Sequence, residues 1–259
     1  MLTKVKLIAV NTFKESVRNK ALYSIFTFLA LLLVVSSFFG KVSIGDRDKV
    51  IKDFGLFGLS FFSSIFVILT GSSLLFKEIK QKTIYNILSK SVDRWEFILG
   101  KFVGLFLSSA IFVLLSSLIF FVFLFFVSGK PDFKIFYAFI FILFEVFLMS
   151  SVTILFSSIV VTTSLSGIFS FSVFLVGKST AYLINFIHTS TDISELTMLC
   201  ANLLYFILPD LSLLSVEDLV SAGKDISGRM IFNALIYSVS YSAIVLFIST
   251  YIFKRRELN

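Results

Sequence analysis

Long apolar runs alternate with short charged segments along the whole chain. A helix needs about 20 apolar residues to cross the hydrocarbon core of a bilayer. Six runs are long enough, and we expect each to form a membrane-spanning helix: residues 21–39, 55–76, 102–127, 133–161, 164–187 and 231–253. The first run is too long for the apolar part of a cleavable signal peptide, so we expect it to be retained. The pattern predicts an all-α integral membrane protein with a single transmembrane domain.

The residues before the first span, 1–20, have an amphipathic pattern. One face carries apolar residues at helical spacing and the other carries mostly charged ones: Leu2, Val5, Ala9 and Phe13 against Lys4, Asn11, Lys14, Glu15 and Arg18. A helix with a basic polar face lies along a membrane surface. We therefore expect an amphipathic surface helix here.

The segment before the last span, residues 192–220, is too apolar for an open loop. Within it, Leu196 to Leu208 is mostly apolar but only 13 residues long, which is too short to span, and Pro209 follows. Val216 to Val220 has the pattern of a second short helix. Backbone groups inside a membrane must be hydrogen bonded, so we expect an outer re-entrant or interfacial hairpin.

Composition supports membrane residence independently of the pattern. Hydrophobic residues make up 57% of the 259 and charged residues only 15%. The mean hydropathy is +0.99. Charges this sparse do not cover the surface of a soluble domain of this length.

The basic residues indicate the orientation. Fourteen of the 23 Lys and Arg residues fall in the N-terminal segment, the segment after the second span and the C-terminal tail. Basic residues are enriched on the cytosolic side of membrane proteins. We therefore expect a multi-pass protein of the cytoplasmic (inner) membrane with both termini in the cytosol.

The chain lacks the residues for several kinds of chemistry. It has one histidine, His188, and one cysteine, Cys200, so a metal cluster, an internal disulfide and a Ser-His-Asp triad are not expected. Gly177-Lys178-Ser179 resembles the end of a phosphate-binding loop, but Ser172 stands where the first glycine belongs. We expect no catalytic residue, no metal, no cofactor and no nucleic-acid partner.

The polar segment between the second and third spans, residues 77–101, is the most informative part of the chain. It reads KEIKQKTIYNILSKSVDRWEFILGK, a short charged helix pattern that has no purpose inside a bilayer. Membrane topology alone does not require an amphipathic helix here. The segment therefore indicates contact with a soluble partner in the cytosol.

This segment and the C-terminus carry a resemblance to a known family, the ABC-2 type permeases of ATP-binding-cassette transporters. The first set of matching residues follows the family's cytosolic coupling helix: Glu78, Thr83, Leu88, Ser89, Val92, Arg94, Gly100 and Lys101. The second resembles the stop after the family's last span: Phe253, Lys254, Arg255, Arg256 and Glu257. The chain departs from the pattern at Lys82, where Gly usually stands, and at Ser91, where Pro is common.

The resemblance implies that residues 1–259 form a single permease domain that does not hydrolyse ATP itself. A separate cytosolic ABC ATPase, in two copies, would drive export by alternating access. The permease would pair with a second copy or a sister permease, surrounded by membrane lipid. The residues that the resemblance assigns to ATPase coupling are Glu78, Thr83, Ile84, Ile87, Leu88 and Arg94, with Ile84, Ile87 and Leu88 as apolar knobs in an ATPase groove.

Glu145 is the clear ionisable residue in the core of an expected span. It lies roughly 18 Å along the fourth span, near the midplane, and its helical neighbours are apolar. Two interpretations stay open. Glu145 is either a protonated carboxyl bonded to a Ser or Thr hydroxyl on another span, or a polar point on the transport path or a subunit interface. An ion-driven carrier or channel that uses Glu145 is the alternative function.

Overall fold

The computed structural model of the protein describes residues 2–42, 47–80, 92–160, 162–189 and 207–255. Over these ranges the chain is helical and contains no strand. The elements are α1 Leu2–Val17, α2 Lys20–Val42, α3 Arg47–Lys80, α5 Arg94–Ser128, α6 Ile135–Ile159, α7 Thr163–Thr189, the short 3-10 helix η1 Leu211–Leu214, α9 Glu217–Ser221 and α10 Gly228–Arg255. The predicted all-α class is confirmed for the described part of the chain.

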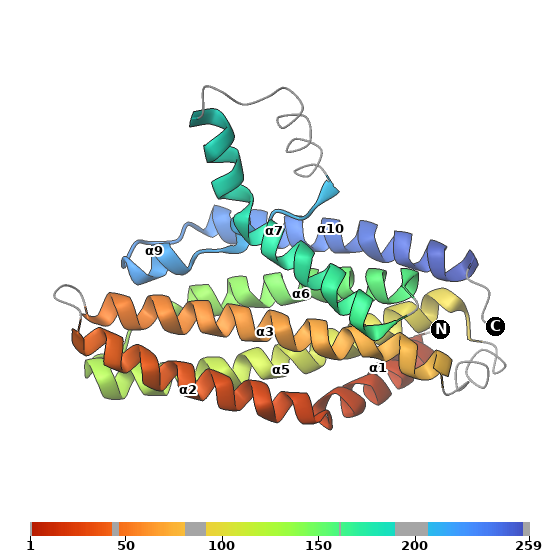
Figure 1. The fold of residues 1–259 in the computed structure, drawn as a ribbon, viewed down its shortest axis with the longest axis horizontal. Helices are drawn as coiled ribbons and strands as arrows, with labels where there is room; N and C mark the ends of the chain where they lie inside the picture. Colours follow the sequence, from red (N-terminus) through yellow and green to blue (C-terminus); the bar gives the residue numbers. More distant parts are fainter. Residues whose placement is uncertain (1, 43–46, 81–91, 161, 190–206, 256–259) are drawn as a thin grey trace.

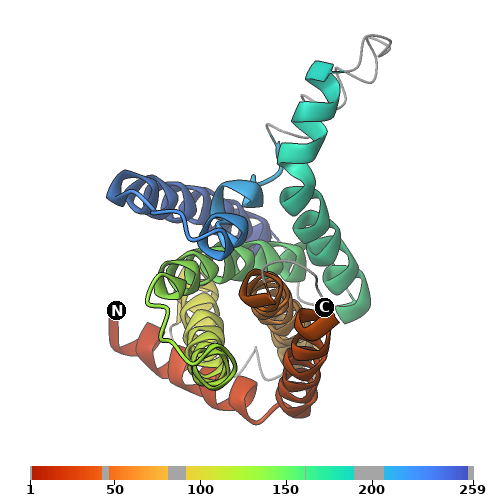
Figure 2. The ribbon, with the colours of Figure 1, turned by 90° about the vertical axis from the view of Figure 1, so that its left-hand side faces the viewer.

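Five of the described helices are long and apolar enough to cross a membrane: α2, α3, α5, α6 and α10. They lie side by side along the long axis of a bundle (Figure 1). The helix α7 occupies the range of the fifth expected span and is not among these five. It crosses the bundle obliquely, and its C-terminal half leaves it (Figures 1 and 2).

The helices α3 and α6 form the centre of the bundle. Both are more deeply buried than α2, α5 and α10. Viewed along its axis, α6 lies between α3, α5 and α10 (Figure 2). Polar side chains on α3 and α6 are thereby enclosed by protein, which is where a membrane protein keeps its ionisable residues.

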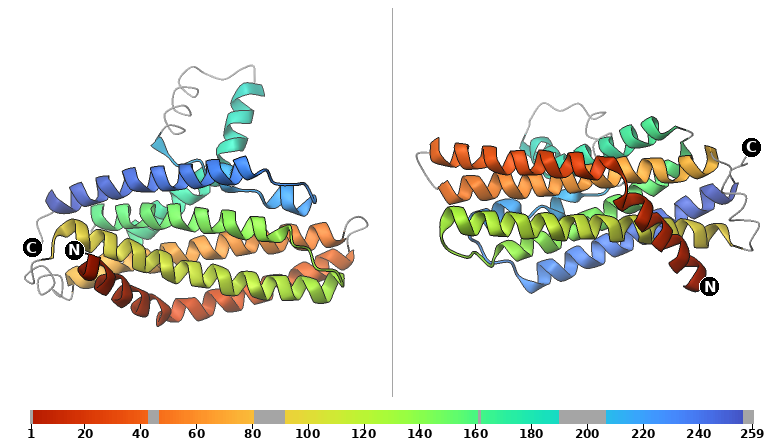
Figure 3. Two further views of the ribbon diagram at one scale, coloured as in Figure 1. Left: turned by 180° about the vertical axis from the view of Figure 1, so that it is seen from behind. Right: turned by 90° about the horizontal axis from the view of Figure 1, so that it is seen from below.

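The first helix, α1, packs across the beginning of α5 (Figure 3). A Cβ atom at Gly104 of α5 would lie 2.5 Å from the Cβ of Thr12 and 2.6 Å from the carbonyl oxygen of Ala9. Glycines four residues apart allow two helices to approach closely, and Gly100 meets α1 in the same way. The buried face of α1 therefore consists of small residues, Ala9, Thr12 and Ser16, rather than the expected apolar stripe alone.

The ends of several elements gather at one end of the bundle. α1, the end of α3, the beginning of α5 and the end of α10 all lie there (Figures 1 and 3). The expected coupling segment is continuous with two of these helices, because Lys77–Lys80 belongs to α3 and Arg94–Lys101 to α5. The α3–α5 connection thus emerges beside α1 and the end of α10.

The short helix α9 packs against α3 and α6 toward the opposite end of the bundle (Figure 1), and η1 packs against α6 and α7. The helix α9, Glu217–Ser221, matches the second short helix expected over 216–220. The first part of the expected hairpin, residues 192–206 with Cys200, lies outside the described residues.

Candidate functional site

Glu145 on α6 is fully buried in the bundle. Ser60 on α3 donates a hydrogen bond to its Oε2 at 2.9 Å, and Ser64, one turn further along α3, donates to its Oε1 at 3.2 Å. Spacing of four residues places both hydroxyls on the same face of the helix. The carboxyl group therefore has hydroxyl partners on a neighbouring spanning helix.

Lys178 on α7 is the charged partner of Glu145. Its Nζ lies 3.0 Å from Oε2 of Glu145 and 3.2 Å from Oε1 of Glu217 on α9. It also donates a hydrogen bond to Ser215 at 2.8 Å. One ammonium group thus connects α6 and α7 to the short segment that precedes α10.

Gly177 allows this segment to approach α7. A Cβ atom at Gly177 would lie 2.7 Å from the carbonyl oxygen of Pro209 and 2.9 Å from Cγ of Leu211. Real side chains do not come so close to backbone oxygen. The glycine next to Lys178 therefore explains how Ser215 and Glu217 come within reach of its ammonium group.

The charges in this cluster make its stability sensitive to the removal of any one charged side chain. Two carboxylates share one cation, and the pair of Glu145 and Lys178 lies where water cannot screen it well. Removal of one partner of a buried ion pair leaves a charge without compensation, which costs far more than loss of an exposed pair. The cluster couples the position of α7 to that of α9.

A cavity of about 460 Å³ adjoins the ion cluster. Its wall combines aromatic rings with polar and charged groups, including Phe57, Phe61, Phe174, Ser60, Lys178 and Glu217. A cavity of this size accommodates a small organic molecule. Its mixed lining suits an amphipathic one.

The opposite end of the bundle contains a second buried ion pair. Lys101 on α5 is fully buried and pairs with Glu78 near the end of α3. Glu96, also on α5, lies 3.9 Å from Lys4 of α1 and accepts a hydrogen bond from the backbone N–H of Asp93 at 3.1 Å. These contacts hold α1, α3 and α5 together where the α3–α5 connection begins and ends.

Arg94 ties the same region to the last helix. Its Nη1 donates hydrogen bonds of 2.8 Å to the carbonyl oxygens of Phe253 and Lys254 at the end of α10. The last carbonyls of a helix lack intrahelical partners, so Arg94 caps α10 from a residue far away in the sequence. The two motifs that carried the family resemblance meet here in space.

The structure places the sequence-predicted residues in three groups. Glu78 and Arg94 lie at the end of the bundle where the α3–α5 connection starts and finishes. Glu145 lies in the ion cluster. The other four predicted residues, Thr83, Ile84, Ile87 and Leu88, lie outside the described residues.

Sequence reasoning missed Lys178 as a site residue. Lys178 lies outside the three segments whose basic residues indicate the cytosolic side, and the structure places it within α7 and against Glu145. The available signal was a single lysine inside an expected span, because such residues pair with another charge. Lys101 is one of the residues that carry the family resemblance, and its position in that motif does not predict that it is a buried partner of Glu78.

Comparison with known proteins gives one family. The sequence pattern of the family described as ABC-2 family transporter protein matches residues 7–258. The family resemblance found from the sequence is confirmed by this match. The comparison with curated proteins gives no match.

Proposed function

The chain belongs to the ABC-2 family of transporter proteins and is a multi-pass membrane permease subunit, and we propose that it works as an exporter. Permeases of this family generally work with a cytosolic ATPase. In our proposal two ATPase copies drive alternating access in a pair of permeases, either identical or sister subunits. The permease itself contributes the path and no catalysis.

The proposed layout has six spans, with α7 as the fifth. The permease lies in the inner membrane, and both termini face the cytosol. The helix α1 lies along the cytosolic surface of this membrane, and residues 192–220 form a re-entrant hairpin on the outer side. The position of α1 and the ends of α3, α5 and α10 at one end of the bundle supports this arrangement. Residues 1–259 act as one permease domain.

The coupling proposal rests on the buried pair of Glu78 and Lys101. Because this pair joins α3 to α5, a push on the connection between them moves two spanning helices as one body. Ile84, Ile87 and Leu88 are proposed to enter a groove of the ATPase, with Thr83 beside them. Arg94 would pass the same motion to α10 through its bonds to Phe253 and Lys254.

The transport path is proposed to pass the Glu145 cluster. The observation that carries this proposal is the link from Lys178 to both Glu145 and Glu217, at the wall of a 460 Å³ cavity. A shift of α7 would break one of these contacts and change access to the cavity. The mixed lining supports an amphipathic cargo.

Substitution of Leu88 tests the coupling. We expect Leu88→Asp to insert into the membrane but to lose the ATPase when the complex is purified from native membranes. The reason is that burial of an unpaired carboxylate in an apolar groove costs about 2 kcal/mol or more. Leu88→Met is the control and should keep the ATPase. If Leu88→Asp still co-purifies with a normal amount of ATPase, the contact lies elsewhere. Ion flux through the permease in the absence of any ATPase would favour the alternative function, a carrier or channel that uses Glu145.

A further inference from the structure

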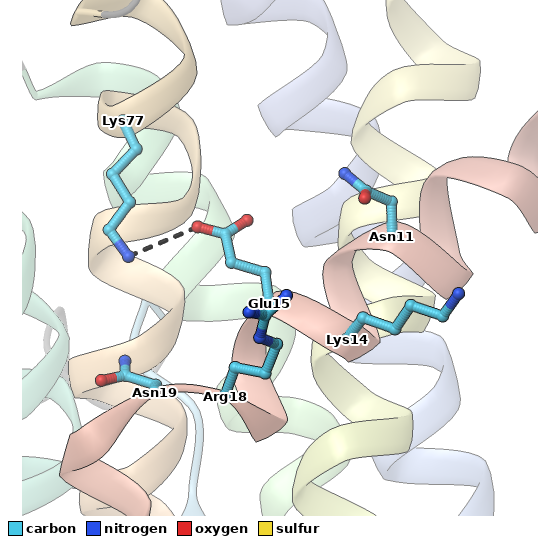
Figure 4. A pocket seen from close by; sticks show the side chains of 6 residues that line it. All are labelled: Asn11, Lys14, Glu15, Arg18, Asn19 and Lys77. Atoms are coloured by element: carbon cyan, nitrogen blue, oxygen red, sulfur yellow. Dashed lines mark hydrogen bonds and ion pairs between the residues drawn. The ribbon is translucent and has the colours of Figure 1, made fainter.

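A second pocket, of about 680 Å³, lies where α1 gives way to α2, beside the end of α3 (Figure 4). Every residue that lines it is polar: Asn11, Lys14, Glu15, Arg18, Asn19 and Lys77. The first five come from α1 and the two-residue link to α2, and Lys77 comes from α3. Neither the coupling proposal nor the transport path uses this pocket.

The pocket carries an excess of positive charge. Lys77 reaches toward α1, and its Nζ lies 3.3 Å from Oε1 of Glu15 (Figure 4). In the part of the chain that the structure describes, the side chains of Lys14 and Arg18 form no ion pair. Three cations and one carboxylate leave a net charge of about +2 at neutral pH.

The donor groups in the pocket match a phosphate. An arginine guanidinium donates two parallel hydrogen bonds to phosphate oxygens, and lysine ammonium groups add point charges. Asn11 and Asn19 supply amide groups, which can donate through their NH₂. A carboxylate or a neutral sugar would use fewer of these donors.

The pocket also lies at the level where a bilayer has its headgroups. The spanning helix α2 begins immediately after Asn19, and Lys77 stands in the last turn of the spanning helix α3. The same α1 helix exposes Leu7, Val10 and Val17. A phospholipid at this position could place its phosphate in the pocket and its acyl chains against apolar side chains.

We propose that this pocket binds the phosphate of an anionic phospholipid headgroup. Basic pockets beside transmembrane helices bind such headgroups. A zwitterionic lipid offers the same phosphate but adds a cation that the positive pocket repels, so the site prefers phosphatidylglycerol to phosphatidylcholine. Bound lipid would hold α1, α2 and the end of α3 together by one headgroup.

The test compares lipid retention by the purified full-length protein in native mass spectrometry. Phosphatidylglycerol or phosphatidylcholine is added in equal amounts, and Lys14→Gln/Arg18→Gln is compared with the parent. Each basic group near an anionic lipid is worth about a fivefold change in affinity, so the double variant should bind phosphatidylglycerol about 25-fold more weakly. The control, Lys6→Gln/Lys130→Gln, removes the same charge from two exposed lysines outside the pocket and should bind like the parent.

Inorganic phosphate separates a lipid site from a site for free phosphate. We expect short-chain phosphatidylglycerol to raise the unfolding temperature of the parent and the control, with no comparable effect of sodium phosphate. A rise with sodium phosphate that disappears in Lys14→Gln/Arg18→Gln would assign free phosphate and overturn the lipid proposal. Equal retention of both lipids, or an equal loss in the control variant, would overturn the site itself. Both pocket residues are exposed, so the folded state should survive their replacement.

Discussion

Lys178 on α7 lies 3.0 Å from Glu145 on α6, and its other carboxylate partner, Glu217, is on α9. The cluster joins three separate elements, α6, α7 and α9. Its ion pairs add to the apolar packing of the segment before α10, in which Leu211, Leu214 and Val220 are buried.

Removal of Lys178 should destabilise the protein strongly. Lys178→Met leaves the buried carboxylate of Glu145 without its cation, and we expect a loss of about 3–5 kcal/mol in unfolding free energy. Glu145→Gln should cost less, because Lys178 keeps Glu217 and Ser215. The double variant Glu145→Gln/Lys178→Met should be more stable than Lys178→Met alone. Thermal unfolding in detergent measures the stability of all three variants.

An exposed ion pair provides the control for this cycle. Lys134 pairs with Asp225, whose side chain is 90% exposed. Because exposed pairs contribute about 0–1 kcal/mol, Asp225→Asn should change stability little. Equal losses for Asp225→Asn and Lys178→Met would mean that the Glu145 cluster is not a buried pair in the membrane protein.

The apolar runs predicted which segments are helical but not how far each helix extends. The expected span 55–76 begins at Arg47 in the structure. Its additional residues, 47–54, are mostly charged, and two of them pair with residues at the end of α5 and in the α5–α6 link: Asp48 with Ser128, and Lys52 with Asp132. Hydropathy identifies the apolar residues that lie in the membrane. It does not predict that the helix continues into a charged segment beyond them.

The candidate site was predictable in part, for a similar reason. Glu145 is conspicuous because its helix is otherwise apolar, and a hydroxyl partner on another span was one of the two interpretations. Its pairing with Lys178 depends on how α6 and α7 cross. Local sequence patterns carry no information about such a long-range contact.

Gly104 should not tolerate even a methyl group. In Gly104→Ala the new Cβ would lie 2.6 Å from the carbonyl oxygen of Ala9, so α1 must move away from α5. We expect a loss of about 1–3 kcal/mol, as for other overpacked contacts, and faster proteolysis of α1. Gly167→Ala is the matched control, because its nearest neighbour lies at 3.8 Å. There the lower entropy of the unfolded chain should leave stability unchanged or raise it by about 0.5–1 kcal/mol.

Asp132, in the link between α5 and α6, should make stability depend on pH. Burial raises the pKa of its carboxyl group, but the hydrogen bond from Lys52 at 2.5 Å, the backbone N–H of Lys134 and both lysine charges outweigh this and hold the pKa below its ordinary value. Since the folded pKa is lower than the unfolded value of about 3.9, the contribution is complete above that pH and is lost as the pH falls through the folded pKa.

Asp132→Asn isolates this contribution. We expect the unfolding temperature of the parent to exceed that of the variant at pH 7, with the difference shrinking below about pH 4 as Asp132 becomes protonated. Asp225→Asn removes a carboxylate that is 90% exposed and should show little difference at either pH. A gap between parent and Asp132→Asn that stays constant down to pH 3 would contradict the ion pair with Lys52.

Cysteine labelling tests the proposed orientation with two exposed residues at opposite ends of the bundle. Lys6 lies on α1, and Lys130 lies in the link between α5 and α6. Each is replaced by Cys in a Cys200→Ser background, which removes the chain's single native thiol. On intact cells an impermeant maleimide should label Lys130→Cys, whereas Lys6→Cys should react only after lysis. Each substitution removes one basic residue from its own side, so neither variant shifts the charge asymmetry more than the other. The reverse labelling pattern would place Glu78, Arg94 and the phosphate pocket on the outer side, where no ATPase could contact the α3–α5 connection.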